Sequence, residues 1–291
     1  MNTIRKIIAG TDFNELATAA VRFGAVMAER MGAELIVVYA DLFEPPAEFT
    51  KGQVQRIAES IRRSKARTRE QLERYVAHNV PGSVKSRAVV AEGSPATAIS
   101  ALAAAEHAGF ITIGTHGRGG LQRLMMGSVA EAVIREAAVP VLTLTAALQA
   151  SSIRRILCPV NDSAVAAAAA GRAAELTESL GAELTLLHLG DGTPQFDPAA
   201  LVTNAEVPPI VVRKESVAGV HPADGILEMA ESGAYDLLVI GAEHRLISDV
   251  TTFGTTAASI IRHSRIPVLT VTSRQHTEAR PGARGDIAHV V

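Results

Sequence analysis

A glycine-rich segment lies between two stretches with different hydrophobic patterns. Gly114 and Gly117 begin it, and after nine further residues it ends at Gly127 and Ser128. The apolar residues 110–114 are typical of a buried strand, and the residues after Ser128 are typical of a helix. Glycines let a backbone approach a ligand closely, and the first N–H groups of a helix point toward bound anions. The pattern therefore predicts a phosphate-binding loop, and a nucleotide is the ligand we expect.

This loop differs from the common phosphate loops. Neither Gly-x-x-x-x-Gly-Lys-Ser/Thr nor Gly-x-Gly-x-x-Gly follows the strand, so no lysine is placed for a γ-phosphate. Arg118 and Arg123 lie inside the loop and could either neutralise phosphate or point into solvent. We interpret His116 as a turn-packing residue rather than a general base. The alternative to a phosphate site is a plain glycine-rich connection with Ser128 as the helix N-cap.

Asp12 follows the first predicted strand, within the sequence AGTDFN of residues 9–14. In a doubly wound parallel sheet, ligands bind in the crevice beyond the carboxyl ends of the strands. A carboxylate there accepts hydrogen bonds from ribose hydroxyls or from an adenine amine. We therefore expect Asp12 to contact the ligand. The alternative is that Asp12 caps the helix that begins near residue 14.

The chain contains an internal repeat, because two short sequences of its first half recur in its second half. The sequence GAEL of residues 32–35 recurs at residues 181–184, an offset of 149 residues. VPVLTL of residues 139–144 recurs as IPVLTV at residues 266–271, an offset of 127 residues. We predict two copies of one domain, at residues 1–148 and 151–273, followed by a disordered tail at residues 274–291. The second copy is shorter by 22 residues, which matches the loss or truncation of its second helix.

Apolar runs alternate with helical patterns in each copy, which indicates an α/β fold with a parallel sheet and helices on both faces. In the first copy, strands are predicted at residues 4–10, 34–40, 84–90, 109–114 and 140–145. Helices are predicted at residues 14–31, 50–79, 95–107 and 128–137. Each copy is therefore expected to be a doubly wound domain with a five-stranded sheet.

The second copy departs from the loop pattern. Its counterpart runs from Gly241 to Gly254, with His244 in place of the second glycine and Glu243 beside it. A positive φ would strain a histidine there, and the carboxylate would repel phosphate. Asn161 replaces Asp12. We interpret this copy as a weakened or lost nucleotide site, with ATP binding supported by the neighbouring Asp162 as the alternative.

The composition narrows the possible partners. The net charge of −2 gives no electrostatic case for nucleic acid or membrane, and the basic residues of the helix at residues 50–79 lack interleaved aromatics. Neither a secretory signal nor an 18-residue apolar window is found. Cys158 is the single cysteine and lies in an apolar strand, so a buried thiol in a reducing compartment is expected.

The glycine loop, Asp12 and the VPVL sequence of residues 139–142 together resemble the universal stress protein family, and the resemblance covers about 270 of the 291 residues. It implies five strands in the order 3-2-1-4-5 in each copy. The first-copy loop is similar to the Gly-x2-Gly-x9-Gly-Ser/Thr motif of the ATP-binding subgroup. Exposed apolar edge strands need partners. The resemblance implies that the two fifth strands pair antiparallel, which makes the chain an internal pseudo-dimer.

The resemblance also implies a site. Asp12 would hold the ribose and adenine end, Ala40 would lie beside the adenine, and Ile113 would pack on the base. The residues that would surround the ribose and phosphates are Gly114, Gly117, Arg118, Gly127, Ser128, Val129 and Ala130. The implied ligand is ATP, with or without Mg, and no residue is assigned as catalytic or as a metal ligand.

The function expected from this resemblance is that of a cytoplasmic, ATP-binding stress protein that acts as a sensor or interaction module. Tandem chains would form a homodimer and bind an unidentified protein partner. The loop lacks a lysine for the γ-phosphate and an evident base to activate water, so at most weak hydrolysis is expected. The alternatives are a slow ATPase, an adenylate-transferring enzyme, or a nucleotide-free scaffold.

Overall fold

The computed structural model describes residues 4–41, 51–115, 126–145, 153–190, 196–202, 210–215, 221–247 and 250–272. Within these ranges, side chains are described except at residues 51–62, 210–211, 213–215, 244–247 and 250–253.

The first half of the chain alternates strands and helices as its periodicity predicts. Its elements are β1 (Lys6–Gly10), α1 (Glu15–Met31), β2 (Glu34–Asp41), α2 (Lys51–Asn79), β3 (Ser86–Glu92), α3 (Pro95–Ala105), β4 (Phe110–Gly114), α4 (Ser128–Glu136) and β5 (Val141–Leu144). Every predicted boundary lies within two residues of the observed one. These elements are called domain one below.

The second half, called domain two, repeats this order with two differences. Its elements are β6 (Arg155–Pro159), α5 (Ala164–Leu180), β7 (Glu183–Gly190), η1 (Pro198–Val202), β8 (Ile210–Glu215), α6 (Pro222–Ala230), β9 (Leu237–Ala242), β10 (His244–Ile247), β11 (Val250–Phe253), α7 (Thr255–His263) and β12 (Val268–Thr272). The short 3-10 helix η1 stands where domain one has the 29-residue α2, so the described residues confirm the predicted loss of the long helix. The hairpin β10–β11 is a feature that the repeat does not predict.

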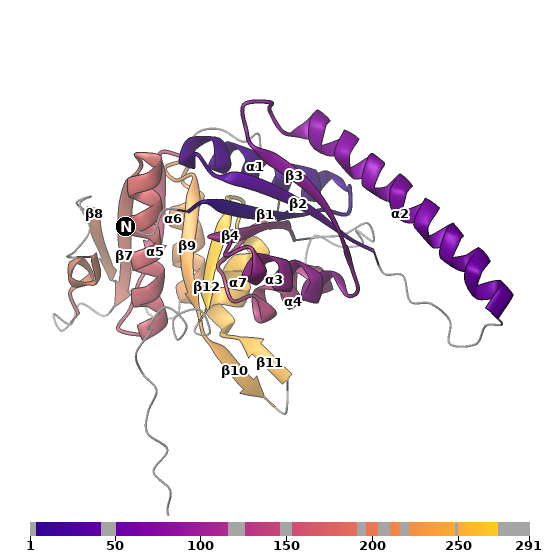
Figure 1. Cartoon of the computed structure of the whole chain (residues 1–291). Helices are drawn as coiled ribbons and strands as arrows, with labels where there is room; N and C mark the ends of the chain where they lie inside the picture. The colour runs from indigo at the N-terminus through magenta and orange to yellow at the C-terminus, as the bar shows by residue number, and fades with distance from the viewer. Residues whose placement is uncertain are drawn as a thin grey trace, which may run out of the picture.

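The two domains share one ten-stranded sheet (Figure 1). Its strand order is β3-β2-β1-β4-β5-β12-β9-β6-β7-β8, which contains the expected 3-2-1-4-5 order twice. All neighbouring pairs are parallel except β5 with β12, where Leu142 lies opposite Leu269 and Thr143 opposite Val268. This antiparallel pair confirms the internal pseudo-dimer. Each fifth strand covers the apolar edge that the other would expose.

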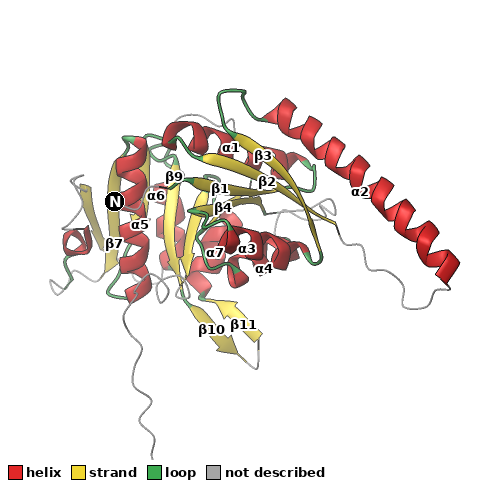
Figure 2. Cartoon of the chain, in the orientation of Figure 1, coloured by secondary structure: helices red, strands yellow, loops and turns green. Residues whose placement is uncertain are grey.

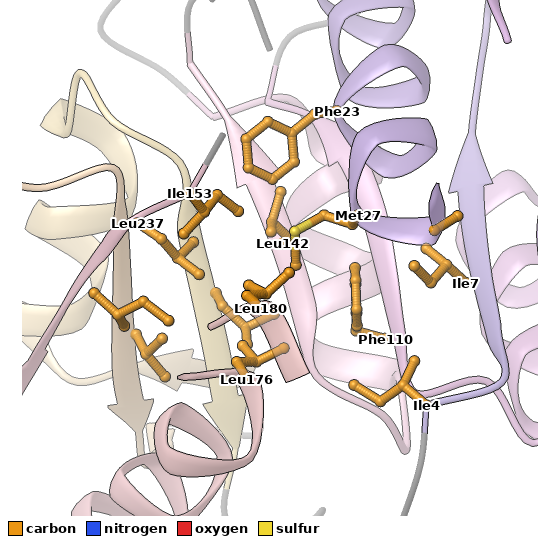
Figure 3. Close-up of a cluster of buried hydrophobic side chains, with 14 of the residues drawn as sticks. Ile4, Ile7, Phe23, Met27, Phe110, Leu142, Ile153, Leu176, Leu180 and Leu237 are labelled. Atoms are coloured by element: carbon orange, nitrogen blue, oxygen red, sulfur yellow. The ribbon is translucent and has the colours of Figure 1, made fainter. Parts of the chain in front are cut away.

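Helices cover both faces of the sheet (Figure 2). Buried residues of α1, α2 and α5 form one hydrophobic cluster with one face, and those of α3, α4, α6 and α7 form another with the opposite face. The first cluster crosses the domain boundary, as Figure 3 shows, where Met27 and Leu142 of domain one lie near Ile153 and Leu180. The two domains therefore share a core on this face.

Hydrogen bonds also join the domains. Arg30, in the last turn of α1, donates to the carbonyl oxygens of Ile153 at 3.3 Å and Leu180 at 3.5 Å. Leu180 is the last residue of α5, and a guanidinium is favourable there because the carbonyls of the last helical turn carry partial negative charge. The hydroxyl of Thr143 donates to the Val268 carbonyl at 3.3 Å. The chain is thus held as one unit by a shared sheet, a shared core and polar bonds.

A group of charged side chains ties domain one together at the amino-terminal edge of its strands. Glu106, which follows α3, accepts a hydrogen bond from Lys6 at 2.6 Å, and its other oxygen lies 2.8 Å from Arg87. Arg87 of β3 also pairs with Glu34 of β2 at 3.4 Å. The hydrogen bond from Lys6, followed by that from Arg87, lowers the pKa of Glu106 from 4.5 to about 2.

We expect Glu106 to stabilise the fold in a pH-dependent way. Because its pKa is lower in the folded chain, its contribution is fully present above about pH 4.5 and is lost as the pH falls toward about 2. Glu106→Gln should lower stability by about 1 kcal/mol at pH 7, given the solvent exposure of its partners, and by much less at pH 2, where about half of the carboxyl groups are protonated. Urea unfolding at a series of pH values measures this difference.

The control is Glu73→Gln, which removes one exposed pair with Arg69 on α2. It should cost less than Glu106→Gln at neutral pH. If Glu106→Gln lowered the free energy of unfolding equally at pH 7 and pH 2, the result would contradict an electrostatic origin of this stabilisation.

Two further expectations concern the single cysteine and membrane-spanning helices. Cys158 is fully buried in β6, and burial raises the pKa of its thiol, which confirms a core cysteine. In the described part of the chain, no helix combines the length and the apolar character that crossing a bilayer would require.

Candidate functional site

In domain one, the carboxyl end of β1 presents Asp12 on a tightly bonded turn. The backbone N–H of Asn14 donates to Asp12 Oδ1 at 3.1 Å, and the Asn14 side-chain amide donates to Asp12 Oδ2 at 3.1 Å. The N-cap of α1 is Asn14, whose Oδ1 accepts from the Ala17 N–H at 2.7 Å. The alternative that Asp12 caps this helix is therefore wrong. Asp12 is half-buried, and Asn14 fixes the direction of its carboxylate.

Sequence reasoning missed the residue beside it. Phe13 has a φ of 67°, a left-handed conformation that is rare for an aromatic side chain and costs about 1–3 kcal/mol. Its ring stacks on Tyr39 with centroids 5.0 Å apart and meets Tyr75 edge-on at 5.1 Å. Tyr75 Oη accepts from Thr11 Oγ1 at 3.2 Å and donates to Thr18 Oγ1 of α1 at 2.9 Å, so α2 is anchored to the turn that carries Asp12 and to the helix that follows it. A strained residue that neighbours overdetermine is typical of a functional turn.

The end of β4 supplies two of the predicted site residues. Ile113 is nearly buried and lies close to the end of β1, where a Cβ on Gly10 would be 3.7 Å from Ile113 Cδ1. A Cβ on Gly114 would lie 2.8 Å from the backbone carbon of Leu16 and 2.9 Å from the Ala17 nitrogen. Gly114 is thus required for the close approach of β4 to the first turn of α1, a packing role that the sequence did not indicate.

The two ends of the glycine loop meet at the amino end of α4. The Gly127 N–H donates to the Thr115 carbonyl at 2.6 Å, which holds the start of α4 beside the end of β4. Gly127 is the N-cap, with a φ of −64°, and makes no side-chain cap bond, so the expectation that Ser128 caps the helix is wrong. The first intrahelical bond is donated by Glu131 to the Gly127 carbonyl.

The helix start therefore has the form of an anion site. Ser128, Val129 and Ala130 precede that first bond, and their N–H groups have no acceptor among the described residues. Ser128 and Val129 are exposed, whereas the Ala130 side chain is buried. Backbone N–H groups in this arrangement bind phosphate or carboxylate oxygens.

The remaining predicted residues are placed as follows. Ala40 lies in β2, opposite Ala91 of β3, at the same carboxyl edge of the sheet as Asp12. Gly117 and Arg118 fall outside the described residues, as do the other loop candidates His116 and Arg123.

Domain two holds a cavity of about 330 Å³ at the corresponding place. It lies beyond the carboxyl ends of β6, β7 and β9, and the amino ends of α5, α6 and α7 border it. Asn161 lines it, whereas Asp162 does not. The alternative in which Asp162 supports a ligand here therefore has no geometric support.

The segment between Gly241 and Gly254 forms the hairpin β10–β11 in place of a loop (Figure 1). His244 begins β10 and lies opposite Phe253, so its backbone is extended and the expected strain at this position is absent. A sequence signal was present. Two runs of four residues, HRLI and VTTF, flank Ser248 and Asp249, which are common turn residues.

The comparison with known families agrees with this geometry. The sequence model of the universal stress protein family matches residues 3–144, 152–206 and 195–272, which is most of the chain. The chain belongs to the universal stress protein family. The family implies a role in the stress response.

Relatives and solved structures extend this result. A universal stress protein of Methanocaldococcus jannaschii is 32% identical over 147 residues, which cover 49% of this chain and 83% of that protein. One from Mycobacterium tuberculosis is 35% identical over 139 residues, 46% of this chain and 42% of that protein. A universal stress protein structure from Archaeoglobus fulgidus superimposes with a TM-score of 0.68, covering 94% of this chain and 99% of its own at 18% identity. At that identity, the likeness establishes the fold alone.

Proposed function

We propose that domain one binds ATP and that the chain acts as a nucleotide-dependent sensor or interaction module in the stress response. The observation that carries this proposal is the start of α4, where no side chain caps the first backbone N–H groups. The hydrogen bond from the Gly127 N–H to the Thr115 carbonyl holds this start beside the end of β4. In a doubly wound sheet, this is where the first helical N–H groups meet a phosphate.

Each end of the nucleotide has a proposed partner. The Asp12 carboxylate, oriented by Asn14, would accept hydrogen bonds from the ribose hydroxyls. Ile113 and the main chain at Ala40 would contact the adenine. The phosphates, with or without Mg, would be surrounded by Gly114, Gly117, Arg118, Gly127, Ser128, Val129 and Ala130.

A sensor is favoured over a catalyst because the loop sequence places no lysine at the γ-phosphate and no evident base beside it. Binding without efficient turnover suits a protein whose surface depends on occupancy. Cytoplasmic location and homodimers of tandem chains stay predictions. Steady-state phosphate release distinguishes a slow ATPase from a sensor, and copurified nucleotide distinguishes both from a nucleotide-free scaffold.

Gly127→Glu is expected to abolish ATP binding and preserve the fold. The added carboxylate occupies the phosphate position with like charge, yet an acidic residue at a helix N-terminus is itself stabilising. Calorimetric titration of the unaltered chain should give one ATP per chain. ATP at about 100 times its Kd should add about 2.7 kcal/mol to stability. Both signals should vanish in the variant.

The matched control is Gly254→Glu, the same change at the N-cap of α7 in domain two. It should leave one ATP per chain. The proposal would be overturned if the unaltered chain carried no nucleotide after purification and its melting temperature did not rise with ATP. A stoichiometry of two ATP per chain would overturn the assignment of the site to domain one alone.

A further inference from the structure

The turn after β1 is closed by a chain of hydrogen bonds that passes through α2. The Phe13 N–H donates to Thr11 Oγ1 at 3.0 Å, and Thr11 Oγ1 donates to Tyr75 Oη at 3.2 Å. Tyr75 Oη donates to Thr18 Oγ1 at 2.9 Å, and Thr18 Oγ1 donates to the Asn14 carbonyl at 2.7 Å. Each hydroxyl donates one bond and accepts one, an arrangement in which neighbouring bonds polarise one another. Tyr75 is the member of this chain that comes from a distant part of the sequence.

The last turns of α2 are the part of the helix that is packed on domain one. Leu72 and Val76 are buried in the core cluster on this face, and the half-buried Tyr75 lies between them in the sequence. The rest of the helix extends away from the sheet (Figure 1). The Tyr75 ring meets the Phe13 ring edge-on, and this contact helps to offset the cost of the positive φ of Phe13. The packed end of α2 therefore supports the strained turn.

Domain two shows that the fold does not require this strain. The repeat offset of 149 residues pairs Asp162 with Phe13. Among the described residues other than glycine, a positive φ occurs at Phe13 and His107 and not at Asp162. The short η1 replaces α2 in domain two, so the strained turn and the long helix occur together, in the domain that has Asp12. Strain that the scaffold does not need, and that neighbours maintain, is typical of a functional site.

The direction of the Asp12 carboxylate depends on this support. Asp12 lies between Thr11 and Phe13, and its two oxygens accept from the backbone and side chain of Asn14. All three of these neighbours belong to the chain of hydrogen bonds that Tyr75 closes. If α2 leaves its place, Phe13 loses a ring contact and Thr11 loses an acceptor. A relaxed φ at Phe13 then redirects the backbone between Asp12 and Asn14, and the carboxylate loses its fixed direction.

We propose that Tyr75 is a positioning residue for the nucleotide site of domain one, through which the docking of α2 is coupled to the binding of the ribose at Asp12. This inference rests on the proposed function, which assigns the ribose hydroxyls to Asp12. The coupling is reciprocal, because a docked α2 favours ribose binding and bound nucleotide favours a docked α2 by the same factor. The position of α2 is then the part of the surface that depends on occupancy.

Tyr75→Phe tests the first half of the coupling in the full chain without any ligand. The variant keeps the ring and removes the hydroxyl that closes the chain of hydrogen bonds. Hydrogen exchange should become about tenfold faster at the Asn14 and Ala17 amides, which donate to side-chain oxygens in this turn. The matched control is Tyr235→Phe, the same change in domain two, which should leave both exchange rates unaltered.

Two nucleotides test the second half. Calorimetry of Tyr75→Phe should show ATP binding weakened roughly fivefold or more, within the range typical of coupled sites. Binding of 2′,3′-dideoxy-ATP should be unaltered, because this nucleotide lacks the hydroxyls that Asp12 would accept from. A general loosening of the domain would weaken both nucleotides equally. In the unaltered chain, ATP should slow the exchange of the α2 amides more than that of the α5 amides, which lie on the same face in domain two.

The proposal would be overturned by unaltered Asn14 and Ala17 exchange in Tyr75→Phe. Equal losses of affinity for ATP and for 2′,3′-dideoxy-ATP would also overturn it, as would α2 exchange that does not respond to bound ATP. An unaltered chain that does not bind ATP would instead overturn the proposed function. The two failures are distinguishable, because the exchange of the turn is measured without ligand.

Discussion

Residues 1–148 expressed alone are expected to associate through the edge of β5 or to precipitate, whereas in the full chain β12 covers that edge. The isolated domain would expose the edge of β5, whose partner β12 lies in domain two. Leu142 and Met27, both fully buried in the full chain, would lose Ile153 and Leu180 as neighbours. An unpaired apolar edge beside an exposed apolar face is a template for association. Light scattering of both proteins at matched concentrations measures the difference.

The control for this prediction places a charged side chain on β5, the strand that the isolated domain would leave without its partner β12. Leu142→Lys in the isolated domain should reduce the association, because lysine on an edge strand opposes pairing. The same change in the full chain should be strongly destabilising, because it buries a charge in the shared core. A stable monomer of residues 1–148 at high concentration, without any change, would show that the fifth-strand pairing is dispensable.

Gly114→Ala is expected to destabilise the chain by about 2–3 kcal/mol. The added methyl would lie 2.8 Å from the backbone of Leu16, and backbone at the start of α1 cannot move aside as a flexible side chain can. The shift would also displace the turn that carries Asp12, so ATP binding should weaken in parallel. Thermal and urea unfolding measure the first effect, and calorimetry measures the second.

The matched control is a glycine substitution that we expect to raise stability instead of lowering it. Gly171 lies inside α5, and a Cβ there meets no atom within 4 Å. Gly171→Ala should therefore raise stability by about 0.5–1 kcal/mol, because alanine loses less backbone entropy in a helix. Equal and small effects at Gly114 and Gly171 would contradict the close packing of β4 on α1.

Much of the fold follows from the sequence because its elements are regular and locally encoded. The alternation of apolar runs with helical periodicity places all nine elements of domain one within two residues of their observed bounds. The repeat predicts the second domain, and the four prolines between β7 and α6 are consistent with the short η1 in place of α2. For the site, the sequence identified Asp12 and the two described loop glycines, Gly114 and Gly127, and all three lie at the carboxyl edge of the sheet.

Other features depend on contacts between distant residues, and only the tertiary structure decided them. The left-handed Phe13 is held by Tyr39 and Tyr75, which are 26 and 62 residues away, so no local pattern announces it. The cap of α4 is Gly127 rather than Ser128 because the bond to Thr115 fixes where the helix starts.

For the cavity of domain two, too, the sequence determined one part and the tertiary structure another. The sequence alone determined which side chains depart from the phosphate pattern, namely Asn161, Glu243 and His244. It suggested that the site was weakened or lost, since each change opposes phosphate. Only the tertiary structure decided that about 330 Å³ stays open there, because the space depends on how β7, α6 and α7 pack around the end of β9. Residue types are local, whereas the volume between elements is a property of their packing.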